Sequence, residues 1–170
     1  TAVLEAVGDR ATVVMGAGSF DTAETVTRVG RACELGAHAV MVVNPYYSRP
    51  SQEGLYAHFA ASAEASTVPV MLYNIASRSA VNLETATLER LTRVARIGAV
   101  KEASGNLVQI AEACGLSSAD FVVYSGDDGL TLPALAVGAV GVVSVAGHVA
   151  GPEIGSMIDE FQSGYLARAQ

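Results

Sequence analysis

The sequence predicts an α/β fold, and three observations favour an incomplete (β/α)₈ barrel. Short β-branched apolar runs alternate six times with longer amphipathic stretches, without a linker or a change in composition. The runs are continuously apolar, which is typical of parallel strands covered on both faces. Almost every run ends on polar or reactive residues. A barrel brings all strand carboxyl ends to one face, whereas a doubly wound sheet needs polar residues only beside its switch point.

The individual elements follow from local patterning. Two helices begin with a capping box, in which Asp21 precedes Glu24 and Asn106 precedes Gln109 by three residues. Strands are expected at 12–15, 39–43, 68–73, 97–101, 121–124 and 141–145, and helices at 22–35, 52–65, 83–94, 107–114 and 130–137.

The chain is short for this fold. It has 170 residues, whereas eight βα units take about 250. Residues 1–7 resemble the last turns of a helix, and the sequence stops in another helical stretch. We therefore expect one barrel domain over residues 1–170 that holds approximately strands three to eight, without two N-terminal βα units and a C-terminal helical region.

Charge and composition argue against several classes of function. The net charge is −7 and no basic cluster is present, which disfavours nucleic acid and anionic membranes as partners. Residues 129–152 carry no charge, but Pro133, Gly138 and Gly141 interrupt them, so we expect a buried helix and a buried strand. Cys33 and Cys114 form no Cys-x-x-Cys pair, which fits a reduced, cytoplasmic compartment.

Lys101 is the strongest candidate for chemistry, because it is the only lysine and ends an apolar strand. Strand alternation places Ala99, Lys101 and Ala103 on one face, where small neighbours leave space around the amine. Desolvation lowers the pKa of such an amine from about 10.4 towards neutrality, as a Schiff-base nucleophile requires. We expect an imine with an α-keto acid. The alternative is a structural lysine paired with Glu102 or Asp127.

Three tyrosines and one arginine also follow strands. A phenol such as that of Tyr46, Tyr47 or Tyr73 can relay protons without full ionisation. Alternatively, the adjacent Tyr46 and Tyr47 pack an interface. Arg78 lies in the segment after the strand that carries Tyr73, where it could bind a carboxylate or simply be solvated.

Two other motifs carry less weight. Gly16-x-Gly18 follows a strand, but Asp21 replaces the third glycine of a dinucleotide fingerprint and would repel a pyrophosphate. Asp127 and Asp128 lack a third ligand at suitable spacing, so we expect a helix cap and no metal. The histidines form no ligand pattern; they are His38, His58 and His148.

Five segments, in order and spacing, resemble dihydrodipicolinate synthase of the N-acetylneuraminate lyase superfamily. They are Asn-Pro-Tyr-Tyr-Ser-Arg-Pro at 44–50, Tyr-Asn-Ile-Ala-Ser-Arg-Ser at 73–79, Lys-Glu-Ala-Ser-Gly-Asn at 101–106, Ser-Gly-Asp-Asp at 125–128 and Gly-Val-Val-Ser-Val at 141–145. The resemblance implies that Lys101 condenses with pyruvate and that the enamine attacks L-aspartate 4-semialdehyde. The product would cyclise to 4-hydroxytetrahydrodipicolinate, on the route to lysine and diaminopimelate.

The resemblance also assigns roles around the lysine. Tyr73 would relay protons beside the Schiff base, and Tyr47 would reach into a neighbouring subunit's site. Arg78 would hold the carboxylate of the aldehyde substrate, and the backbone at Gly126 and Val143 would line the pyruvate site. Such enzymes are homotetramers of tight dimers and need neither an organic cofactor nor a metal.

The sequence differs from the family pattern at several positions, and these differences affect the expected roles. The family's Thr-Thr pair belongs to an earlier strand. Ala76, Ser79 and Ala80 replace Pro, Thr and Gly, so we expect a freer loop at Arg78. Phe20 stands where lysine-inhibited members have Asn, which predicts no feedback inhibition by lysine. Sialic acid lyases and keto-deoxy-sugar aldolases share the Lys and the Tyr, and a non-catalytic oligomer partner is a further alternative.

Overall fold

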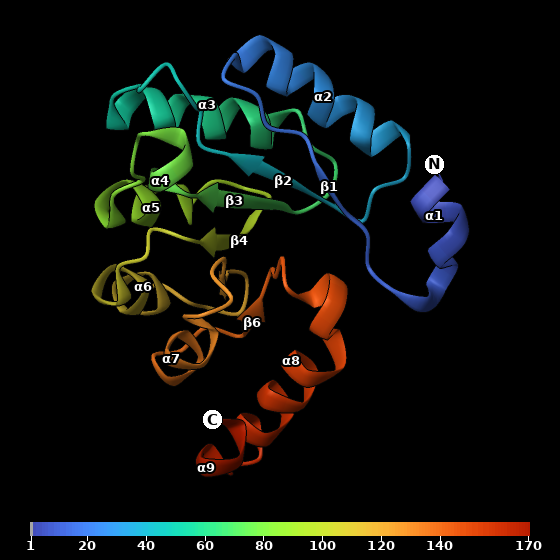
Figure 1. The fold of residues 1–170 in the computed structure, drawn as a ribbon. Helices are drawn as coiled ribbons and strands as arrows, with labels where there is room; N and C mark the ends of the chain where they lie inside the picture. The colour runs from blue at the N-terminus through green and yellow to red at the C-terminus, as the bar shows by residue number, and fades with distance from the viewer. Residues whose placement is uncertain (1) are drawn as a thin grey trace.

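A parallel six-stranded sheet forms the centre of the computed structural model, which describes residues 2–170. The strands lie side by side in sequence order (Figure 1). Their bounds are β1 Val14–Gly16, β2 Ala39–Val43, β3 Val70–Asn74, β4 Ile97–Glu102, β5 Val122–Ser125 and β6 Gly141–Val142. A doubly wound sheet would reverse its order at a switch point. The predicted fold, an incomplete (β/α)₈ barrel, is therefore confirmed.

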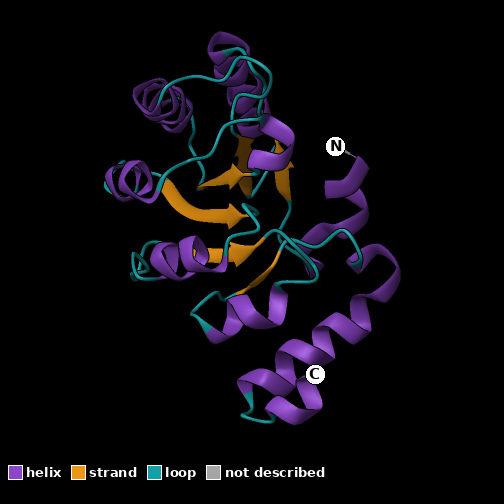
Figure 2. Cartoon of the chain, turned by 60° about the vertical axis from the view of Figure 1, so that its left-hand side comes forward, coloured by secondary structure: helices purple, strands orange, loops and turns teal. Residues whose placement is uncertain are grey.

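Helices follow the strands one by one and form an arc around them (Figure 2). The helices that connect consecutive strands are α2 Thr22–Glu34, α3 Gln52–Glu64, α5 Thr85–Leu91, α6 Leu107–Cys114 and α7 Thr131–Ala136. Half of each predicted capping box forms: Asp21 accepts from Glu24 N, and Asn106 accepts from Gln109 N. The side chains of Glu24 and Gln109 do not complete the boxes, because Glu24 accepts from Ser19 and Gln109 donates to Glu102. The remaining elements are α1 Ala2–Val7, the 3₁₀ helix Gly8–Arg10, α4 Ala76–Ser79, α8 Gly147–Gln162 and α9 Leu166–Ala169.

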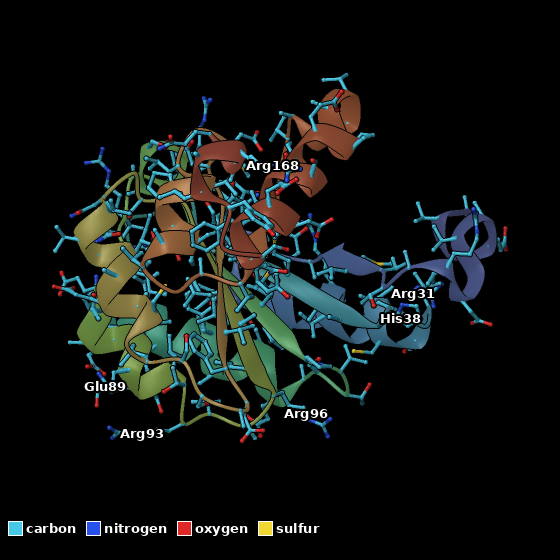
Figure 3. All side chains as sticks on the ribbon, turned by 90° about the horizontal axis from the view of Figure 1, so that it is seen from below. Arg31, His38, Glu89, Arg93, Arg96 and Arg168 are labelled. Atoms are coloured by element: carbon cyan, nitrogen blue, oxygen red, sulfur yellow. The ribbon has the colours of Figure 1, made fainter. Side chains whose placement is uncertain are left out.

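The two faces of the sheet have different environments. Val40, Val42, Leu72, Val100 and Val123 are fully buried in the core beneath the helices. Full burial of such a side chain contributes about 1.5–3 kcal/mol to the stability of the fold. The alternate residues form the inner face, which the described helices leave partly uncovered. Charged side chains lie at the periphery, where Arg93 pairs with Glu89 at 2.6 Å (Figure 3).

Strand β4 contains one extra residue relative to β3. Val70 pairs with Ile97, but the next residue, Met71, pairs with Ala99. Gly98 is therefore a bulge, so Ile97 and Val100 both reach the outer core although they are three residues apart. The bulge therefore determines which face of the sheet each later side chain of β4 points to.

The second half of the 129–152 stretch differs from the prediction. The strand stops at Val142, and α8 begins at Gly147. Val145 and Val149 are 72% and 90% exposed, so this part is not buried. The helix has non-helical backbone at Ala150, just before Pro152, whose ring and missing N–H disfavour a regular turn. Among residues 2–170, no helix is long and apolar enough to cross a membrane.

Arg78 also lies in a different setting from the expected free loop. It belongs to the short helix α4, which Ser79 stabilises by donating its hydroxyl to Ile75 O at 2.9 Å. The helix ends at Ala80 in the left-handed conformation, with φ +60°. An alanine in this region is strained because its Cβ approaches the following carbonyl.

We predict that Ala80→Gly raises the free energy of unfolding by about 0.5–1 kcal/mol, because glycine relieves this strain. Urea denaturation measures the change. Ala76→Gly, at the right-handed start of α4, is the control and should lower stability by a similar amount. Equal signs for the two substitutions would contradict the prediction.

Candidate active site

Strand pairing brings reactive side chains to the inner face at the carboxyl ends of β2 to β5. Tyr73 on β3 pairs with Lys101 on β4, and Lys101 pairs with Tyr124 on β5. Val43 on β2 pairs with Tyr73 from the other side. Residues that are directly opposite each other on parallel strands point the same way. These four side chains therefore share one rung of the sheet.

Lys101 is buried on this rung, with 6% of its surface exposed. Its Nζ lies 4.2 Å from the centroid of the Tyr73 ring. Burial lowers the pKa of the Lys101 amine, and the negative charge of Asp128 opposes that shift. Loss of hydration disfavours the ammonium form, so a larger fraction of the amine is neutral and nucleophilic.

The alternative of a structural ion pair is wrong. Glu102 faces the opposite side of β4, where its carboxylate accepts hydrogen bonds from Asn74 and Gln109. Asp127 accepts from the backbone N–H groups of Gly129 and Leu130, at 2.9 and 3.3 Å. Within residues 2–170, no carboxylate lies within 4.0 Å of the Lys101 amine.

The phenol of Tyr73 remains protonated at neutral pH. Burial raises the pKa of Tyr73, and the charge of Arg78 partly offsets this. A protonated phenol beside an amine can donate a proton to a developing alkoxide and later take one back. The ring face also stabilises the charged form of Lys101 through cation–π attraction.

Gly126, at the end of β5, packs directly against the lysine. A Cβ there would lie 2.9 Å from both Cγ and Cε of Lys101 and 2.7 Å from Cβ of Ala103. Its N–H donates to Glu102 O at 2.8 Å, which holds the backbone in place. Only glycine fits at this position without displacing Lys101.

Asp127 and Asp128 have different tasks. Asp127 accepts from the backbone of Gly129 and Leu130 in the turn before α7, whereas the N-cap residue of α7 is Leu130 without a side-chain cap, so the predicted helix cap is wrong. Asp128 instead binds the loop after β6: it accepts from the Ser144 hydroxyl and from Ala146 N at 2.9 Å. These hydrogen bonds are the main cause of its lowered pKa, to which the Lys101 charge adds. Residues 2–170 contain no group of three or more acidic, His or Cys side chains that could hold a metal ion.

The other predicted residues lie further out. Arg78 is exposed on α4 and has no carboxylate partner in the described chain. Tyr47 is 91% exposed and has a positive φ of 72°, so it does not pack against Lys101. Tyr46 packs edge to face on Phe20, with ring centroids 5.6 Å apart. Val143 N donates to Ser125 O at 2.9 Å, which ties the segment after β6 to the end of β5.

The influence of Asp128 on Lys101 could not be predicted from the sequence, since the two residues are 27 positions apart along the chain. The polar side chains behind the lysine strand were not predicted either. The sequence does carry a signal for these side chains, because Asn74 and Glu102 each end a strand, Asn44 directly follows one, and all three come after an inward-facing residue.

The chain is similar in sequence to proteins of one known family. The sequence profile of the dihydrodipicolinate synthetase family matches residues 1–170. The chain belongs to this family. It is 51% identical over 164 residues to a 4-hydroxy-tetrahydrodipicolinate synthase of Desulforamulus reducens, covering 96% of this chain and 55% of that protein. It is 50% identical over 167 residues to one from Halalkalibacterium halodurans, with 98% and 57% covered.

Solved structures of the dihydrodipicolinate synthetase family show the same fold. The enzyme from Bacillus anthracis superposes with a TM-score of 0.95 at 48% identity, covering 99% of this chain and 57% of that one. A structure described as a monomeric dihydrodipicolinate synthase variant gives 0.96 at 35% identity, with 99% and 57% covered. The chain thus spans between 55% and 57% of the length of these curated relatives and structures.

We predict that Gly126→Ala lowers the free energy of unfolding by about 1–3 kcal/mol, because the new methyl group overlaps Lys101 and Ala103. Thermal or urea denaturation measures it. Gly129→Ala is the matched control in the same loop, since its Cβ would meet only Asp127 Oδ1 at 3.4 Å. A larger loss for the control would show that the packing described here is wrong.

We also predict that Asp128→Asn moves the titration of Lys101 to lower pH. Asp128 stabilises the ammonium form, so its neutralisation leaves the effect of burial less opposed. Competitive acetylation of Lys101 across a pH series, read on its peptide, gives the midpoint. Asp127→Asn should leave that midpoint unchanged, because Asp127 is not among the charges acting on Lys101. A shift to higher pH in Asp128→Asn would refute the assignment.

Proposed function

We propose that this chain carries the Schiff-base site of a 4-hydroxy-tetrahydrodipicolinate synthase, a lyase that condenses pyruvate with L-aspartate 4-semialdehyde. The observation that carries the proposal is the buried Lys101 amine, which lies over the ring of Tyr73 and has no carboxylate partner among residues 2–170. The names of the relatives at 50% and 51% identity support the choice of substrates.

The chemistry begins at the neutral Nζ of Lys101. Nζ attacks the keto carbon of pyruvate, and loss of water gives a protonated imine. Loss of a proton from the methyl carbon gives an enamine, which forms a carbon–carbon bond to the aldehyde of the second substrate. The amino group from the aldehyde substrate then attacks the imine carbon, which closes the ring to 4-hydroxytetrahydrodipicolinate and releases the Lys101 amine. The imine itself is the electron sink, so the reaction needs no organic cofactor and no metal.

The surrounding residues would divide the remaining tasks. Tyr73 would protonate the carbinolamine oxygen before water leaves, and Tyr47 of a neighbouring subunit would continue the relay. The guanidinium of Arg78 would bind the carboxylate of the aldehyde substrate. The backbone at Gly126 and Val143 would line the pyruvate site, which fits the absence of a side chain at Gly126.

We further propose that residues 1–170 belong to one barrel domain and that the protein works in the cytoplasm as a tetramer of tight dimers. Tyr46 and the exposed Tyr47 would lie at the dimer interface. The positive φ of Tyr47 supports this assignment, because such strained residues cluster where a partner or ligand holds them. A monomeric variant among the similar structures makes assembly a separate question from catalysis.

Borohydride reduction of the full chain with pyruvate should leave one reduced pyruvyl group on Lys101, located by peptide mapping. Lys101→Arg keeps the charge but cannot form the imine, and should give no adduct. Absence of an adduct on the unsubstituted protein would refute the Schiff-base mechanism. Turnover of pyruvate with a sugar aldehyde, and none with aspartate semialdehyde, would refute the choice of second substrate.

A further inference from the structure

A buried row of polar side chains lies behind the Lys101 rung. Asn44, Asn74 and Glu102 each follow an inward-facing residue, so strand alternation turns them to the outer face. All three are buried there, at 0%, 0% and 1% exposure. A polar row in an otherwise apolar layer costs free energy unless its hydrogen bonds are satisfied.

Glu102 is a buried carboxylate whose partners are neutral donors. Asn74 Nδ2 donates to its two oxygens at 3.0 and 3.2 Å, and Ser104 N donates at 2.7 Å. Gln109 Nε2, from α6, adds a contact at 3.3 Å. Within residues 2–170, no Arg, Lys or His forms an ion pair with Glu102. A buried carboxylate without a cation lowers the stability of the fold. Such a group is retained where it favours one packing of the chain over another.

Asn74 connects the three strand ends. Its Oδ1 accepts from Leu83 N at 3.0 Å and from Asn44 Nδ2 at 2.8 Å. The backbone donor at Leu83 fixes the orientation of the carboxamide, so that Nδ2 points at Glu102 and at Asn82 Oδ1, which lies 2.9 Å away. One side chain on β3 therefore binds both neighbouring strands.

The bulge at Gly98 explains why this connection matters. A strand that carries an extra residue has an alternative pairing one residue out of step, and such a slip exchanges its two faces. In that register Val100 would lie opposite Tyr73 on the inner face, and Lys101 would lie opposite Asn74 and turn into the helix layer. The Asn74–Glu102 pair lies one residue beyond the Tyr73–Lys101 pair, where it opposes this slip.

We propose that Asn74 and Glu102 are positioning residues for the lysine: their hydrogen bonds on the outer face lock β3 and β4 in the register that places Lys101 Nζ over the Tyr73 ring. We call this pair of hydrogen bonds the register lock. Its role in catalysis rests on the proposed function of Lys101. The lock itself is a property of the sheet and can be measured without turnover.

The test exchanges the two partners in the full chain. Asn74→Asp places two carboxylates against each other, and Glu102→Gln removes the acceptor charge. Each single substitution should lower the rate of pyruvate trapping on Lys101 about tenfold or more, the cost of one misplaced charge-assisted hydrogen bond. The double variant Asn74→Asp/Glu102→Gln restores a carboxylate–carboxamide pair in the reverse direction. It should recover trapping to within about threefold of the parent.

A second readout is the labelling of Lys101 by an amine reagent, followed on its peptide. This rate should change in the single variants and return in the double variant. Ser62→Ala removes a buried hydrogen bond to His58 O, remote from the strand ends, and is the control for stability loss alone. It should lower the melting temperature without changing the labelling of folded protein.

The outcomes separate the two hypotheses. No pyruvate adduct on the parent protein refutes the proposed function, while labelling still tests the lock. Single variants that lose stability but keep the trapping and labelling rates of the folded parent, as expected for Ser62→Ala, refute the lock. A double variant that does not fold, or that recovers neither readout, also refutes it. If the single variants fail to fold, recovery in the double variant supports the lock.

Discussion

Parallel pairing between β3 and β4 determines which face of the sheet each reactive group occupies. Tyr73 and Lys101 are opposite each other on the inner face, and Asn74 and Glu102 are opposite each other on the outer face. Because side chains alternate along a strand, a change of one residue in this pairing would exchange the amine and the carboxylate. The position of the lysine, its pKa and its contact with Tyr73 all depend on this register.

Separation of the charges across the sheet gives each one a suitable environment. Lys101 lies among Ala99, Ala103 and Gly126, where burial favours the neutral amine. Glu102 lies on the other side among amide donors, which stabilise a charged carboxylate without a cation. If the two groups shared one face, they would form an ion pair, and the lysine would remain an ammonium ion.

Loops after the strands also affect the environment of Lys101. Asp128, after β5, binds the loop after β6 and also places a negative charge near Lys101. Gly126 brings the backbone of the same loop against the lysine side chain. Membership of the dihydrodipicolinate synthetase family accounts for the strand framework. Between β3 and α5, the short helix α4 carries Arg78 and ends at the left-handed Ala80.

The sequence by itself determined the strand order and the barrel class, and it predicted Lys101 as the residue for chemistry. These follow from local signals: β-branched runs, capping boxes at Asp21 and Asn106, and a lone Lys at a strand end. Tertiary structure alone decided the bulge at Gly98, the early end of β6, the amide surroundings of Glu102 and the action of Asp128 on Lys101. The reason is physical. Each of these features depends on contacts between segments that are far apart in the chain. Such contacts produce no periodic pattern of residues, so they cannot be predicted from the sequence.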